Sequence, residues 1–150
     1  VLIDDRAITL SETLKSAQDL ARPCCKQVGG APLPHLEDDP LLATKKSLAI
    51  SIISSCLVLV STQMNELGLR GGVKIKAQDV GSGVAIIISA DHLTPSSFKE
   101  VGSLLENYVG KDPTVGIIAG EQEIQVIFSL VSNKNLGENE LLTYSKRGSR

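Results

Sequence analysis

Asp91 is the residue whose position most strongly points to chemistry. It follows an apolar run from Val84 to Ala90, and the segment after it leads to Thr94-Pro95, where a helix is predicted to begin. Nucleotide- and ligand-binding folds often place an acid at the boundary between a buried strand and a helix. Two roles are open for this carboxylate: contact with a purine, or capping of the turn or helix that follows.

The other reactive residue types have spacings that indicate little chemistry. His92 has no partner in the sequence around it, which is typical of an exposed loop histidine. Gly81-Ser82-Gly83 joins two predicted strands and leads into no helix, so it indicates a hairpin turn rather than a phosphate-binding loop. No residue order indicates a catalytic triad, and no spacing indicates a metal site.

The three cysteines are Cys24, Cys25 and Cys56. An odd number without C-x-x-C spacing argues against a disulfide framework and against a zinc site. Arg22 and Lys26 give the first two only a weakly electropositive neighbourhood, so structural roles are expected. Cys56 lies in an apolar helical segment and should behave as a small hydrophobic residue.

The composition predicts one cytoplasmic α/β domain over residues 1–132 and a polar tail or linker over 133–150. The 150 residues suffice for one core, which must consist of Ile, Leu, Val and Ala because aromatic residues make up only 3%. The formal net charge is −2 and the charges are scattered, which argues against nucleic-acid binding. Ser47 to Thr62 is uncharged but shorter than the ~20 residues of a membrane span, so a buried helix is predicted there.

The periodicity predicts three helices. The first follows a capping box at Thr9 and should end near Ala21 or Arg22, because Pro23 follows. A loop or irregular strand over 28–40 leads to a long helix that starts at Asp39-Pro40, an N-cap acid before a proline. Gly68 is the predicted C-cap of the long helix. A third helix is predicted to start at Pro95 or Ser96 and to end at Gly110. Its predicted buried stripe consists of Phe98, Val101, Leu104, Leu105 and Tyr108.

Two hairpins complete the predicted fold. The first joins the alternating strand that begins at Val73 to the apolar strand 84–90, and the second joins 115–119 to 123–131. In the last strand Ile124, Val126, Phe128 and Leu130 should point the same way. Locally paired antiparallel strands with helices on one face form a two-layer α/β sandwich.

This element order, with four local segments, resembles the catalytic and ATP-binding domain of sensor histidine kinases, whose fold is shared with gyrase, Hsp90 and MutL ATPases. The four segments are 8–14, 37–42, 70–75 and 84–91. The resemblance covers roughly residues 8–131. It implies that Asp91 bonds the adenine amino group and that the cofactor is ATP or ADP with magnesium.

The sequence also departs from this family, and the departures imply a degenerate member. No asparagine that would hold magnesium stands between Leu41 and Met64, and His92-Leu93-Thr94 replaces the glycines that follow the family's aspartate. About twenty residues separate Asp91 from Lys111, which leaves no room for the lid over the phosphates. Phosphoryl transfer depends on metal and preorganised donors, so these losses argue against it.

The resemblance implies a two-component-type signalling module that acts through protein contact. Its partners would be a response regulator or a helical histidine-bearing domain, and a homodimer is allowed. His35 precedes Pro40 at a spacing similar to that of the phosphoacceptor histidine box, but it follows Pro34 in a predicted loop, so we interpret this match as accidental. The alternative hypothesis is a non-catalytic interaction or dimerisation module that binds no nucleotide.

Overall fold

The computed structural model of the chain describes residues 7–131, which form three helices and six strands. The helices are α1 (Leu10–Lys26), α2 (Lys46–Glu66) and α3 (Pro95–Val109). The strands are β1 (Ala7–Thr9), β2 (Leu41–Lys45), β3 (Lys74–Asp79), β4 (Gly83–Ser89), β5 (Val115–Ala119) and β6 (Glu123–Ser129). The predicted polar tail, 133–150, lies outside the described residues.

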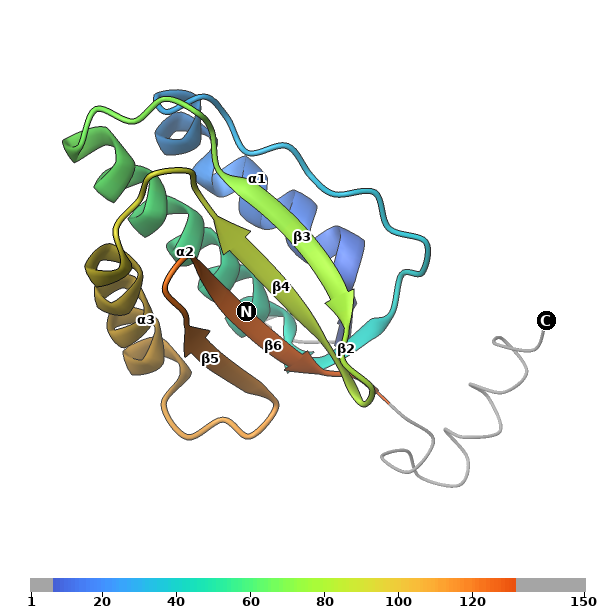
Figure 1. Ribbon diagram of the computed structural model, residues 1–150. Coiled ribbons are helices and arrows are strands. Elements are labelled where there is room, and N and C mark those ends of the chain that lie inside the picture. Colours follow the sequence, from blue (N-terminus) through green and yellow to red (C-terminus); the bar gives the residue numbers. More distant parts are fainter. Residues whose placement is uncertain (1–6, 132–150) are drawn as a thin grey trace, which may run out of the picture.

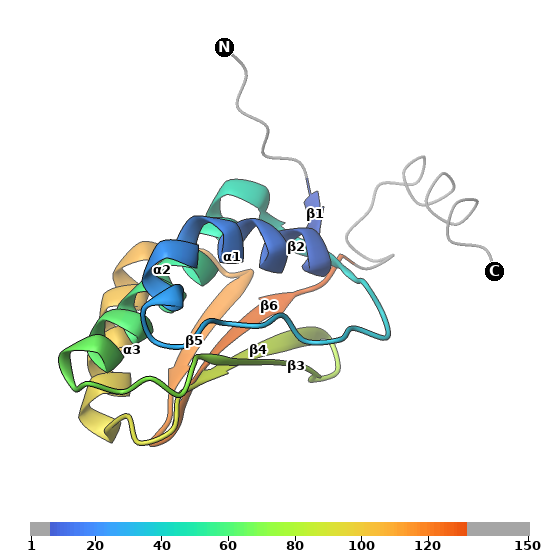
Figure 2. The same cartoon turned by 90° about the horizontal axis from the view of Figure 1, so that it is seen from above.

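Four strands form one antiparallel sheet in the order β3-β4-β6-β5, and β1 pairs with β2 in a small second sheet. The helices lie on one face of the larger sheet, and none of the described elements covers its other face (Figures 1 and 2). The predicted two-layer α/β sandwich and both predicted hairpins are therefore confirmed.

The inner face of the sheet is apolar because side chains alternate along each strand. Ile86 of β4 lies beside Ala77 of β3 on one side and Val126 of β6 on the other. The predicted inward row of β6 is also confirmed, since Ile124, Val126 and Phe128 are fully buried. These side chains belong to one core cluster to which all three helices contribute.

α2 is the central helix of the helical layer. It packs between α1 and α3 and also contacts β4. By length and composition alone α2 would suffice to cross a membrane, but 44% of its most apolar window is buried inside the molecule. The segment Ser47–Thr62 thus lies where the sequence predicted it, in a helix whose inner side forms the core.

Two predicted helix starts are confirmed. The Thr9 hydroxyl accepts a hydrogen bond from the Glu12 amide at 3.3 Å, which caps α1. α3 begins at Pro95, and the Thr94 hydroxyl accepts a hydrogen bond from the Ser97 amide at 3.2 Å. In both helices a hydroxyl satisfies an amide that has no partner within the helix.

The predicted end of α1 near Ala21 or Arg22 is wrong, because the helix continues past Pro23 to Lys26. Proline removes one backbone hydrogen bond and normally interrupts a helix. Here Ala21 and Cys25, on either side of the proline, are both buried in the core. Burial of the following turn outweighs the lost hydrogen bond and extends the helix.

The predicted start of the long helix at Asp39-Pro40 is also wrong. Leu41–Lys45 forms β2, in which burial alternates, and the helix begins only at Lys46. Asp39 instead accepts two hydrogen bonds from Ser11, one from its backbone N–H at 2.7 Å and one from its hydroxyl at 2.5 Å. The acid therefore caps the first turn of α1, where the helix dipole favours a negative charge.

Glycines with positive φ follow the C-terminal ends of α1 and α2. The C-cap predicted at Gly68 is confirmed by a φ of 72°, and the Leu69 amide reaches back to the Met64 carbonyl at 2.9 Å. After α1, Gly29 has a φ of 110°, and a Cβ there would lie 2.5 Å from the Arg70 carbonyl oxygen. Only glycine fits this crossing of two chain segments.

Candidate functional site

Asp91 lies in the turn after β4, and its carboxylate already has a partner. Lys74 Nζ of β3 lies 2.9 Å from Asp91 Oδ2, and both side chains are largely exposed. The hydrogen bond from Lys74, and then its charge, hold the pKa of Asp91 below its usual value, with a smaller contribution from His92. The carboxylate is therefore ionised and paired with an ammonium group.

Asp91 does not cap α3, because Thr94 does, and that predicted alternative is wrong for the helix. His92, which follows it, is exposed, as the sequence predicted. Its φ of 69° lies in the left-handed region that favours glycine. The backbone after Asp91 thus has a glycine-type conformation, although a histidine occupies the position.

The space between this turn and α2 is filled. Leu93 and Phe98 are buried, and the Ser97 hydroxyl donates a hydrogen bond to Gln63 Oε1 of α2 at 3.1 Å. Gln63 Nε2 in turn donates to Glu100 Oε2 at 3.0 Å. These contacts hold the start of α3 against the end of α2, and Asp91 lines none of the three pockets described below.

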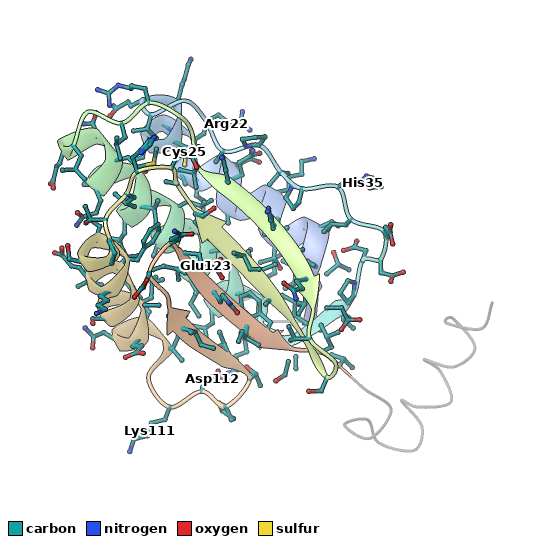
Figure 3. All side chains as sticks on the ribbon, in the orientation of Figure 1. Arg22, Cys25, His35, Lys111, Asp112 and Glu123 are labelled. Atoms are coloured by element: carbon teal, nitrogen blue, oxygen red, sulfur yellow. The ribbon has the colours of Figure 1, made fainter. Side chains whose placement is uncertain are left out.

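His35 lies on the exposed loop between α1 and β2, as predicted (Figure 3). It lines a pocket of about 420 Å³ between this loop and the β3–β4 hairpin, together with the acids Glu37, Asp38 and Asp79. Among residues 7–131 no group of three or more His, Cys, Asp or Glu side chains has an arrangement that would hold a metal ion.

All three cysteines are free thiols, and Cys25 and Cys56 are buried. Burial raises the pKa of Cys25, an effect that a hydrogen bond with Ser61 partly offsets. Burial also raises the pKa of Cys56, which confirms its expected behaviour as a core residue. Cys25 and Arg22 border an open pocket beside Gly29, but a thiol with a raised pKa is a poor nucleophile (Figure 3).

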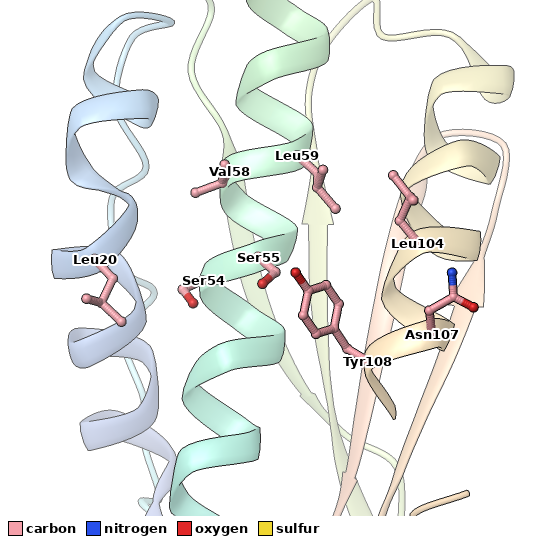
Figure 4. Close-up of a pocket in the computed structure, with 8 residues that line it drawn as sticks. All are labelled: Leu20, Ser54, Ser55, Val58, Leu59, Leu104, Asn107 and Tyr108. Carbon is pink, nitrogen blue, oxygen red and sulfur yellow. The ribbon is translucent and has the colours of Figure 1, made fainter. Parts of the chain in front are cut away.

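The helical layer has an apolar groove on its outer surface. The groove has a volume of about 420 Å³ and crosses α2 between α1 and α3 (Figure 4). Leu20 of α1 lies on one side, and Leu104 and Tyr108 of α3 lie on the other. The complete lining is Leu20, Ser54, Ser55, Val58, Leu59, Leu104, Asn107 and Tyr108, none of which carries a charge.

The groove corrects the predicted buried stripe of α3. Phe98, Val101 and Leu105 are buried as predicted, but Leu104 is 41% exposed and Tyr108 58% exposed. Leu20, at 66%, is even more exposed. Leu104 and Tyr108 share the apolar face of α3 with the buried residues, so helical periodicity alone does not distinguish them. Their exposure depends on the groove, which long-range packing creates.

A comparison of the chain with models of known protein families and with curated proteins finds no match.

Proposed function

We propose that this domain acts by protein–protein contact, as a degenerate module of the two-component type, and that the groove between α1, α2 and α3 is its contact surface. One observation carries the proposal. In the described part of the chain seven large apolar side chains are exposed, and three of them line this groove. Apolar side chains gathered on one face are typical of interaction sites.

The chemistry of the groove favours an apolar helical partner. Ser54 and Ser55 on its floor are small and let another backbone approach closely. The Ser54 hydroxyl already donates a hydrogen bond to the Ser51 carbonyl at 3.2 Å, so its hydrogen-bonding donor is satisfied without a polar partner. Tyr108 offers an aromatic anchor of the kind that dominates binding energies. We therefore propose as partner a helical histidine-bearing domain or a response regulator, the two classes that the family resemblance implies.

We propose further that the domain binds no ATP or ADP with magnesium. The pairing of Asp91 with Lys74, and the packing of α3 against Gln63, favour loss of that activity. A cytoplasmic location, with α2 as a core helix rather than a membrane span, is part of the same proposal.

The nucleotide arm of the proposal is tested by thermal unfolding with millimolar ADP or ATP plus magnesium. A ligand at ~100 times its Kd stabilises the folded state by ~2.7 kcal/mol, so binding would raise Tm measurably. We expect no shift. A rise in Tm that Asp91→Ala abolishes would contradict the proposal and restore a nucleotide site at this turn.

The contact arm is tested by titrating the labelled domain with helical histidine-bearing domains and with response-regulator domains, followed by NMR. We expect shifts at groove residues, and Kd values raised at least ~10-fold by Leu20→Asp or Tyr108→Asp. Leu67→Asp is the matched control, because Leu67 is similarly exposed but lies beyond the end of α2. Equal effects of all three substitutions, or shifts confined to the open sheet face, would rule out the groove.

A further inference from the structure

The four-stranded sheet ends in two edge strands, β3 and β5. The register of β5 follows from two backbone hydrogen bonds to β6, Ser129 N–H to the Thr114 carbonyl and Gly120 N–H to the Glu123 carbonyl, both 2.8 Å. Backbone groups alternate in an antiparallel ladder. The N–H and C=O groups that point away from β6 are therefore those of Val115, Ile117 and Ala119.

The two edges differ in their chemistry. β3 carries Lys74, Lys76 and Asp79, and charges on an edge strand discourage pairing with another chain. β5 is Val-Gly-Ile-Ile-Ala, with neither a charge nor a proline. An uncharged edge with free backbone groups is a template for another strand. It is the margin of the sheet opposite β3 in Figure 1.

We propose that β5 pairs with β5 of a second copy of this chain, antiparallel about a twofold axis at Ile117. The pairing joins the two four-stranded sheets edge to edge. Because Ile117 points its N–H and C=O outward, it forms a hydrogen-bonded pair with Ile117 of the other copy. This surface lies on the sheet margin and is independent of the groove on the helical layer.

The side chains fit this register. Ile118, 51% exposed on the open sheet face, comes to lie opposite Gly116 of the second copy. A Cβ at Gly116 would meet nothing within 4 Å, so there is room for the isoleucine.

The short strand makes a small contact, so we expect a weak dimer that forms as concentration rises. The test is sedimentation velocity of the full chain from about 10 µM to about 1 mM, the range in which weak dimers assemble. The mass should rise from the 15.9 kDa of one chain towards twice that value. Ile118→Lys, which charges the edge, should raise the apparent Kd at least ~10-fold.

Leu20→Lys is the matched control, since it places the same charge on an exposed apolar residue of the groove and should leave the dimer unchanged. A second readout needs no variant. Amide hydrogen exchange at Val115, Ile117 and Ala119 should slow as concentration rises, while the outward amides of Ile75 and Ala77 on β3 should not change.

Three results would overturn the proposal. One is a monomer throughout the concentration range. Another is a dimer that survives Ile118→Lys but is lost in Leu20→Lys, which would place the second copy in the groove. The third is amide protection at the β3 edge instead of the β5 edge.

Discussion

Asp91 and Lys74 show how one neighbour decides the chemistry of a conspicuous acid. The two side chains pair at 2.9 Å on the surface, where an ion pair adds little to stability because water and salt screen it. The pKa of Asp91 is lowered, so the pair contributes to stability above the pKa of an unfolded aspartate. That contribution is lost as the pH falls through the lower pKa of the folded state.

The pairing predicts a specific titration. Lys74→Gln should move the pKa of Asp91 upward, towards its usual value, because the principal hydrogen bond and charge are removed. NMR of the Asp91 carboxyl group during an acid titration measures the change. Lys76→Gln, on the same strand, is the control and should leave the titration unchanged. A pKa that does not respond to Lys74→Gln would contradict the assigned cause.

At the scale of elements, α3 approaches β5 closely because residue 102 is a glycine. A Cβ at Gly102 would lie 2.7 Å from the Cβ of Ala119. Glycine costs a helix ~1 kcal/mol relative to alanine, so its presence inside α3 reflects packing rather than helix propensity. The close contact sets the position of the helix over the edge of the sheet.

Gly102→Ala should therefore destabilise the protein although it improves helix propensity. We expect the free energy of unfolding to fall by ~1 kcal/mol. Overpacking costs ~1–3 kcal/mol, and the higher helix propensity of alanine offsets part of that cost. In an Ala119→Gly background the same substitution should become neutral or stabilising. Urea unfolding of the four variants measures this coupling, with Ser103→Ala as an exposed control in the same helix. Stabilisation by Gly102→Ala alone would show that the contact relaxes freely.

For the whole molecule, α2 links both helices and the sheet through one core cluster. Its inner side is fully buried at Leu57, whereas Leu59 is half-buried and lines the groove. The same helix thus serves the core on one side and the proposed contact surface on the other. Substitutions on its two sides should separate these roles.

Leu57→Ala should lower the free energy of unfolding by ~2–5 kcal/mol, the range for a truncated core leucine. Leu59→Ala should cost less, ~1 kcal/mol, because the site is open to water. Urea unfolding followed by circular dichroism and by NMR measures both, and the two signals should be lost together if the core is one unit. Equal losses for the two variants would contradict the central place assigned to α2.

The local elements were predictable wherever short-range chemistry decides them. Thr9 and Thr94 each cap a helix through the amide three residues further along the chain, and the positive φ of Gly68 ends α2. The hairpins follow from period-two alternation and from turn residues. Together the helices and hairpins imply the two-layer sandwich, because the apolar face of the sheet and the apolar faces of the helices must be buried against each other.

Long-range contacts decided what the sequence left open or predicted wrongly. Pro23 stays in a helix because Ala21 and Cys25 are buried, and Asp39 caps α1 because the chain folds back onto Ser11. The pairing of Asp91 with Lys74 also joins distant residues. By itself the sequence determined the three helices, the two hairpins and their two layers. Only the tertiary structure decided the small β1–β2 sheet, the order of the strands, the free edge at β5 and the groove, because each depends on which distant segments meet.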